Sequence, residues 1–127
     1  MPNNSKRLGE WAEAEFVARA MERGWEVFIP HGDSSQYDAI IAKGVLIQTI
    51  QIKSTFTKSL KDRSKWNLGR GTSTKKHYHR GVDFFALYCD TMKGWRFVTP
   101  AATKGQFTFS VKYTDTTTLD NWHALEE

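Results

Sequence analysis

The feature that most constrains the fold is a pair of apolar, β-branched runs on either side of a glycine. Residues 37–42 (YDAIIA) and 45–53 (VLIQTIQIK) flank the dipeptide Lys43-Gly44. Two such runs joined by a two-residue turn that contains glycine predict a β-hairpin. The chain is therefore expected to contain a sheet with at least two neighbouring antiparallel strands.

The hairpin is expected to gather three polar side chains. Because side chains alternate between the two faces of a strand, Gln51 and Lys53 share one face, and the isoleucines beside them share the other. Asp38 lies near the open end of the first strand, so the turn brings it close to both. Taken singly, these residues also fit a simpler interpretation, in which Asp38 ends a strand and Gln51 and Lys53 form an exposed strand face with Gln48.

A helix is predicted over residues 10–23, which contain good helix formers and no Pro or Gly, and which Gly24 follows at the position of a C-cap. The apolar face of this helix is formed by Phe16, Val17, Ala20 and Met21. Glu13 projects from the middle of that face. A carboxylate there has to be paired, protonated or bound to a metal ion, and a structural ion pair with Lys53 or an arginine is one alternative. Glu10 lies nearer the edge of the same face and is a second candidate.

The rest of the chain is consistent with an α/β domain. Further strands are expected at residues 25–29, 83–88, 95–99 and 107–112, and short helices at residues 101–104 and 119–125. Residues 55–80 have no clean periodicity, so a long loop with at most one helical turn is expected there. A chain of 127 residues is long enough for one compact domain and too short for two, so residues 1–127 are expected to form a single domain.

Positive charge is concentrated in residues 53–82. This segment holds nine of the 18 Lys and Arg residues and one of the 14 acidic residues, so it carries +8, while the remaining nine cations and 13 acids give −4. Basic residues on one surface favour a polyanion, because their binding releases counterions condensed on nucleic acid. DNA is therefore the expected partner, and a solvated loop kept soluble by its charge is the alternative. The expected DNA-binding residues are Lys58, Lys61, Arg63, Lys65, Arg70, Lys75, Lys76, His77 and Arg80.

Several classes of protein are disfavoured. The one cysteine, Cys89, follows an apolar run, which predicts a buried thiol rather than a reactive one. His77 and His79 lack the further ligands that a zinc site needs. No apolar run reaches the roughly 18 residues of a membrane helix, and residues 1–8 are polar, unlike a secretory signal. A soluble intracellular protein, cytoplasmic or associated with the nucleoid, is expected.

Three motifs occur in an order that is typical of a known family. They are residues 9–13 (GEWAE), 37–38 (YD) and 51–54 (QIKS). Together they resemble the PD-(D/E)XK nuclease superfamily. Within it they look most like the small group I intron homing endonucleases, which have Gln at the second acidic position, and next most like the archaeal Holliday junction resolvases, which share the Gly-x-x-x-Glu helix. The resemblance implies a restriction-endonuclease-like α/β core, with a mixed sheet of four or five strands flanked by helices.

The resemblance also implies a Mg²⁺-dependent DNA endonuclease, in which Mn²⁺ can substitute. Hydrolysis of a phosphodiester needs an aligned water and neutralisation of charge on the phosphoryl oxygens, and Mg²⁺ held by oxygen ligands provides both. The implied catalytic residues are Glu13, Asp38, Gln51 and Lys53. The implied metal ligands are Asp38, the Gln51 amide, the Ile52 carbonyl and Glu13, with Glu10 as the alternative to Glu13. Lys53 would orient the attacking water.

The motifs depart from the family pattern in two places. Gln51 stands where Glu or Asp is usual, which removes one negative charge from the implied metal site. Tyr37 stands where proline is usual, and tyrosine keeps the strand conformation. The first departure leaves the affinity for metal and the number of metal ions open.

Alternative functions are a Holliday junction resolvase, which would share the chemistry but act on branched DNA, and a catalytically inactive nucleic-acid-binding module of the same fold. A third is an interaction protein whose basic loop binds an acidic protein. Because a chain of this size offers one active site, cutting both strands of a duplex implies at least a homodimer, and the resemblance to the intron homing endonucleases also allows a homotetramer. Trp11 and Trp122 are candidates for subunit packing.

Overall fold

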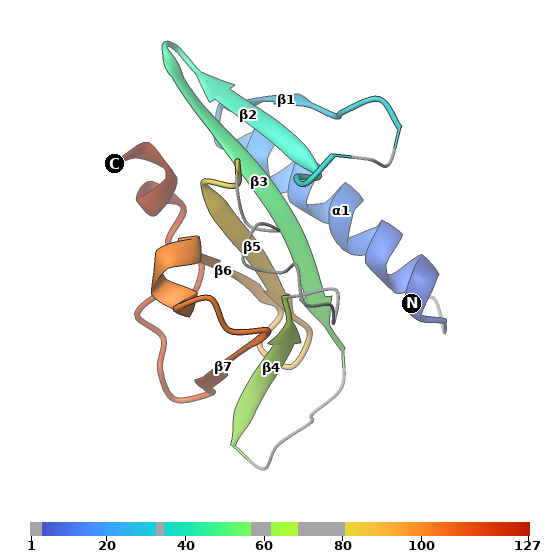
Figure 1. The fold of residues 1–127 in the computed structure, drawn as a ribbon, viewed down its shortest axis with the longest axis vertical. Coiled ribbons are helices and arrows are strands. Elements are labelled where there is room, and N and C mark those ends of the chain that lie inside the picture. Colours follow the sequence, from blue (N-terminus) through green and yellow to red (C-terminus); the bar gives the residue numbers. More distant parts are fainter. Residues whose placement is uncertain (1–3, 33–34, 57–61, 69–80) are drawn as a thin grey trace.

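The fold is built on a mixed five-stranded sheet. The computed structural model shown in Figure 1 describes residues 4–32, 35–56, 62–68 and 81–127. Within these ranges the sheet is formed by β1 (Glu26–Phe28), β2 (Ala39–Lys43), β3 (Leu46–Thr55), β5 (Phe84–Cys89) and β6 (Gly94–Val98), in the order β1-β2-β3-β5-β6. The β3–β5 pair is parallel and the other pairs are antiparallel. The prediction of a mixed sheet of four or five strands is confirmed.

Helix α1 (Ser5–Glu22) covers one face of this sheet (Figure 1). It begins five residues before the predicted start, because the Asn4 side chain caps it by accepting a hydrogen bond from the Arg7 N–H at 2.9 Å. Its buried residues are Ala12, Phe16 and Ala20. They pack against alternate residues of the strands, including Ile50 and Ile52 of β3, so we call this side of the sheet the helix face.

The β2–β3 hairpin is present, and its turn lies one residue later than predicted. Lys43 pairs with Leu46, which leaves Gly44 and Val45 as the turn. Gly44 has a φ of +62°, a conformation that glycine adopts without strain at the first central position of such turns. The register pairs Ala39 with Ile50, and its continuation places Asp38 opposite Gln51.

A second, two-stranded sheet lies over the opposite face, which we call the ribbon face. It pairs β4 (Arg63–Asn67) with β7 (Thr108–Lys112) in antiparallel fashion. The prediction of a loop over residues 55–80 is thus wrong at β4. The strand was missed because its alternation is carried by the small polar Ser64 and by Trp66, both buried, and not by a run of apolar residues.

A second apolar cluster joins this ribbon to the sheet. It contains Trp66, Leu68, Phe85, Leu87, Cys89, Val98 and Val111. The indole N–H of Trp66 donates to the Tyr88 carbonyl at 2.8 Å, and the Ser64 hydroxyl lies 2.7 Å from the Cys89 sulfur. The prediction of a buried thiol at Cys89 is confirmed.

Two 3₁₀ helices, η1 (Pro100–Thr103) and η2 (Trp122–Glu126), occur where short helices were predicted. Trp122 is buried on the helix face, with its ring 5.6 Å from that of Phe16. Its predicted role in subunit packing is therefore wrong, because the ring belongs to the core. Trp11 is half-buried and packs edge-on against Tyr88. Among the described residues, no helix combines the length and the apolar character needed to cross a bilayer.

Candidate active site

The Asp38 carboxylate is fixed to the main chain of β3. Its Oδ2 accepts a hydrogen bond from the Ile52 N–H at 2.7 Å, and its own N–H donates to the Ile50 carbonyl at 2.8 Å. The half-buried Asp38 thus sits on the Gln-Ile-Lys motif, where the hairpin register places it. The predicted proximity of these segments is present in the structure.

Gln51 and Lys53 occupy the ribbon face of β3. They pair in register with Phe85 and Leu87 of β5, whose side chains belong to the apolar cluster beneath the ribbon. Gln51 is only 3 % exposed and Lys53 is half-buried. The alternative interpretation of an exposed strand face is therefore wrong for Gln51. It is also wrong for Gln48, which lies on the helix face, where its Nε2 donates to the Leu125 carbonyl at 2.8 Å.

Glu13 reaches this region from α1, but not as predicted. It is exposed to solvent and does not project from the centre of a buried face, because the sheet covers the side of the helix marked by Ala12, Phe16 and Ala20. Glu13 instead lines a cavity of about 310 Å³ together with Asp38. The other lining residues are Ile29, Pro30, Gly32, Ser35 and Tyr37. Glu10 is exposed and is not among them.

The electrostatics couple Glu13 to the hairpin. Although the Glu13 residue is exposed, neighbouring protein atoms remove part of the water around its carboxyl, and this desolvation raises its pKa above the ordinary value of 4.5. The charges of Asp38 and Glu10 raise it further. The ammonium of Lys53 acts in the opposite direction and lowers it. Glu13 therefore interacts electrostatically with Asp38 and with Lys53, two of the other three predicted catalytic residues.

The donor set fits a hard divalent cation. Carboxylates at Asp38 and Glu13, an amide at Gln51 and the carbonyl of Ile52 are oxygen donors, which Mg²⁺ prefers. Within the described ranges, no three Asp, Glu, His or Cys side chains are placed to hold a metal ion, so a site here depends on the neutral oxygens as well. The Asp38 and Glu13 carboxylates repel each other, and a bound cation would reduce this repulsion.

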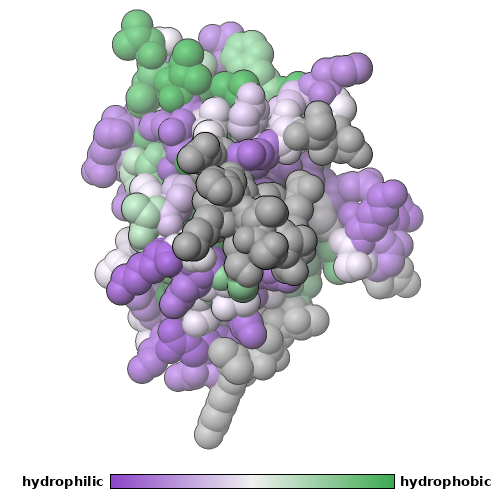
Figure 2. Space-filling model, viewed as in Figure 1, coloured by the Kyte–Doolittle hydropathy of each residue, from purple (hydrophilic) through white to green (hydrophobic). Residues whose placement is uncertain are grey.

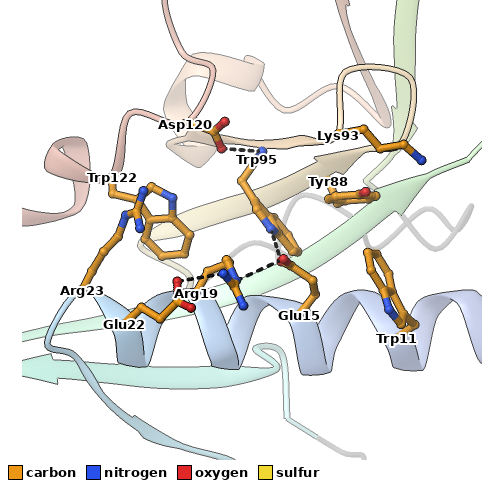
Figure 3. A pocket seen from close by; sticks show the side chains of 10 residues that line it. All are labelled: Trp11, Glu15, Arg19, Glu22, Arg23, Tyr88, Lys93, Trp95, Asp120 and Trp122. Carbon is orange, nitrogen blue, oxygen red and sulfur yellow. Dashed lines mark hydrogen bonds and ion pairs between the residues drawn. The ribbon is translucent and has the colours of Figure 1, made fainter.

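A second, larger cavity of about 450 Å³ lies between α1 and the β5–β6 end of the sheet (Figure 3). Its Glu15 carboxylate accepts a hydrogen bond from the Trp95 indole at 2.8 Å and pairs with Arg19 at 3.1 Å, and Arg19 also pairs with Glu22 at 2.7 Å. Burial and Asp90 raise the pKa of Tyr88 to about 12, so its phenol stays neutral. Because Arg19 bridges both Glu15 and Glu22, these side chains already satisfy one another, and this cavity is a weaker candidate for a metal or phosphate than the Glu13–Asp38 cavity.

Only two of the predicted DNA-binding residues lie within the part of the chain that the structure describes. Arg63 and Lys65 lie on β4, in the two-stranded sheet. Lys58, Lys61, Arg70, Lys75, Lys76, His77 and Arg80 fall outside the described residues. Strand β7 brings further polar side chains beside β4 that the sequence did not point to, including Lys112 opposite Arg63. No local signal links two segments so far apart, because strand pairing at this distance depends on the tertiary fold.

Comparisons with known proteins found one matching family model and similar solved structures. A family model described as PD-(D/E)XK endonuclease matches residues 3–120. A bacterial homing endonuclease, I-Ssp6803I, is similar in structure with a TM-score of 0.79 and 18% identity, over 98% of this chain and 92% of that one. Hjc, a Holliday junction resolvase from the archaeal hyperthermophile Archaeoglobus fulgidus, is similar with a TM-score of 0.56 and 15% identity, over 84% of each chain. No curated protein sequence gave a match. The structural likenesses confirm the predicted restriction-endonuclease-like fold.

Proposed function

Because this chain belongs to the PD-(D/E)XK endonuclease family, we propose that it hydrolyses phosphodiester bonds in DNA with Mg²⁺, through Asp38, Gln51, Lys53 and Glu13. The observation that carries the proposal is the 2.7 Å hydrogen bond between the Asp38 carboxylate and the Ile52 N–H. This bond holds the Asp38 carboxylate against the main chain of the Gln51-Ile52-Lys53 segment. The Glu13 carboxylate lines the same cavity as Asp38, so a second oxygen donor lies near the one that this bond holds.

Each side chain has a distinct role in this proposal. Asp38, Glu13, the Gln51 amide and the Ile52 carbonyl would hold the ion, with Glu13 preferred to Glu10 because it lines the cavity with Asp38. The bound ion would supply Lewis acidity at the scissile phosphate and a more acidic water. Lys53 would orient the attacking water and stabilise negative charge that develops on the phosphoryl oxygens.

We propose duplex DNA as the substrate, cut by a homing-endonuclease-like dimer or tetramer. Support comes from the likeness to the homing endonuclease, which covers more of this chain at a higher TM-score than the likeness to the resolvase. One active site per chain also requires two chains to cut two strands. A cleavage assay on a four-way junction beside a linear duplex tests this choice, and preference for the junction would favour the resolvase.

The catalytic proposal is tested on supercoiled plasmid DNA with Mg²⁺ or Mn²⁺. We expect Asp38→Asn and Lys53→Ala each to slow cleavage by about 10²- to 10⁴-fold. Matched controls on the exposed surface of α1, Glu22→Gln and Lys6→Ala, should cut at the rate of the unmodified protein. Equal rates for all four variants would contradict the proposal. DNA binding without cleavage by the unmodified protein would favour the inactive binding module.

A further inference from the structure

The two-stranded sheet of β4 and β7 presents a uniformly polar outer face. Residues that pair directly across antiparallel strands project to the same side, so the register divides this ribbon into an inner and an outer set. The inner pairs are Ser64 with Val111 and Trp66 with Phe109. The outer pairs are Arg63 with Lys112, Lys65 with Ser110 and Asn67 with Thr108.

The ribbon is firmly attached to the body of the protein. Trp66 is 1 % exposed and its indole N–H donates to the Tyr88 carbonyl at 2.8 Å. Val111 is buried in the same cluster, and Phe109 packs against it. The outer side chains are therefore displayed on a fixed scaffold, which reduces the entropy lost when they bind a partner.

The outer side chains are suited to a nucleic acid. Three of the six are cations and none is acidic, and the nearest acid along β4 is Asp62, just before the strand begins. The other three carry an amide or a hydroxyl, so all six can form hydrogen bonds. The Arg63 guanidinium is oriented across the ribbon by bonds to the Ser110 hydroxyl at 3.2 Å and to its carbonyl at 3.4 Å.

The ribbon lies on the same side of the central sheet as Gln51 and Lys53. Its inner residues pack on Phe85 and Leu87, which neighbour Gln51 and Lys53 in register, and β4 contacts β3. The opposite end of this side, over the β2–β3 hairpin, is hydrophobic in Figure 2, where Val45 and Ile47 are exposed. A polyanion that approaches the candidate active site would therefore favour the ribbon end.

We propose that the β4–β7 ribbon enters the major groove of duplex DNA and determines which sequence the protein binds. The major groove admits a two-stranded β-ribbon and displays a distinct pattern of donors and acceptors for each base pair. Asn67 and Lys65, exposed on the outer face, contact base edges, and Arg63 and Lys112, which pair across one end of the ribbon, contact the phosphates at that end. This inference rests on the proposed function, since it names the surface through which that site selects its substrate.

The test is selection of bound duplexes from a pool with a randomised central segment, in EDTA so that no DNA is cut. The unmodified protein should enrich a motif. Asn67→Ala and Lys65→Ala should each lose preference at one or two base pairs of that motif and bind it about 5- to 100-fold more weakly. Lys112→Ala should weaken binding to all sequences and reduce the salt slope by about one. Lys6→Ala, which removes the same charge from α1, should leave both the motif and the affinity unchanged.

Methylation interference identifies the groove. Methyl groups at guanine N7 lie in the major groove and those at adenine N3 in the minor groove, so binding should be blocked by the former within the motif. The proposal is overturned if both ribbon variants enrich the unmodified motif, if no motif is enriched, or if only adenine N3 methylation interferes. These outcomes can be distinguished from failure of the nuclease proposal. If the unmodified protein cleaves plasmid DNA but the ribbon variants enrich the unmodified motif, only the proposal for the ribbon is contradicted. If the ribbon variants enrich an altered motif but the unmodified protein cleaves no DNA with any divalent ion, only the nuclease proposal is contradicted.

Discussion

At the scale of single residues, the candidate site depends on a main-chain contact. The Asp38 carboxylate is held by the N–H of Ile52, so its position is set by the hairpin register and not by the side chain at position 52. This explains why the hairpin pattern was enough to predict that Asp38 lies beside the segment that carries Gln51 and Lys53. The exposure of Glu13 could not be predicted in the same way, because the helical pattern does not reveal how much of α1 the sheet covers.

The raised pKa of Glu13 predicts a change in stability with pH. The carboxyl has a higher pKa in the folded chain than its ordinary value of 4.5, so the folded state binds a proton more readily than the unfolded state. The free energy of unfolding should therefore fall as pH rises through this interval. Glu13→Gln removes that loss, and we expect it to be more stable than the unmodified protein at neutral pH, by on the order of 0.5 kcal/mol because an exposed carboxylate is screened.

Urea unfolding at several pH values checks this expectation. The difference between Glu13→Gln and the unmodified protein should vanish well below the ordinary pKa of 4.5. Glu10→Gln serves as the control on the same helix, and it should have a smaller effect because Glu10 contributes less to the shift than burial or Asp38. A Glu13→Gln variant that is less stable at neutral pH would show that the carboxylate is stabilising in the folded chain.

Gln51 offers a test of the metal site. Gln51→Glu places a negative charge in a buried position opposite Asp38, so it should lower the melting temperature without metal. If the site binds Mg²⁺, the same charge should tighten binding by on the order of tenfold and enlarge the rise in melting temperature on addition of Mg²⁺. Gln48→Glu, buried on the helix face, is the matched control and should lower the melting temperature without any added response to Mg²⁺.

At the scale of elements, strand β4 was the main failure of prediction. The helix, the hairpin and the strands at residues 83–88, 95–99 and 107–112 carry apolar periodicity, and the structure contains all of them. The β4 sequence RSKWN offers one apolar residue, and its pairing with β7 is decided by packing of the ribbon on β5 and β6. A strand defined by tertiary contacts leaves little signal in the local sequence.

Trp66 should be the anchor of that element. Trp66→Phe keeps most of the packing but removes the hydrogen bond to the Tyr88 carbonyl, so it should cost about 1 to 2 kcal/mol of unfolding free energy. Trp66→Ala should cost about 3 to 5 kcal/mol, because it also leaves a cavity under the ribbon. Guanidinium unfolding measures both costs. Equal stability of the three proteins would mean that β4 is not held on the sheet through this ring.

At the scale of the whole molecule, the two sides of the sheet differ. The helix face is covered by α1 and η2, whereas the ribbon covers the other face over β5 and β6 (Figure 1). The sheet and its helix could be predicted from the sequence, but this division could not, because residues 63–67 carry no clear strand signal. The location of the proposed DNA surface beside the proposed site therefore emerged only from the assembled fold.

The proposed oligomer predicts how plasmid cleavage depends on protein concentration. If one chain cuts one strand, dilution below the dissociation constant of the assembly should cause nicked circles to accumulate before linear DNA. Higher concentrations should give linear DNA directly. Gel analysis of the products across a dilution series, alongside sedimentation of the protein, measures both. Linear DNA formed without a nicked intermediate by a sedimenting monomer would contradict the oligomer.

The parallel pairing of β3 with β5 also affects how the chain is made. During synthesis α1 and the first three strands emerge together and can pair locally, but β3 has to wait for β5, which begins at Phe84. Until then the strand that carries Gln51 and Lys53 has an open edge, and open edges invite pairing with other chains. Overproduction at low temperature, where folding competes better with association, should therefore give more usable protein than rapid synthesis.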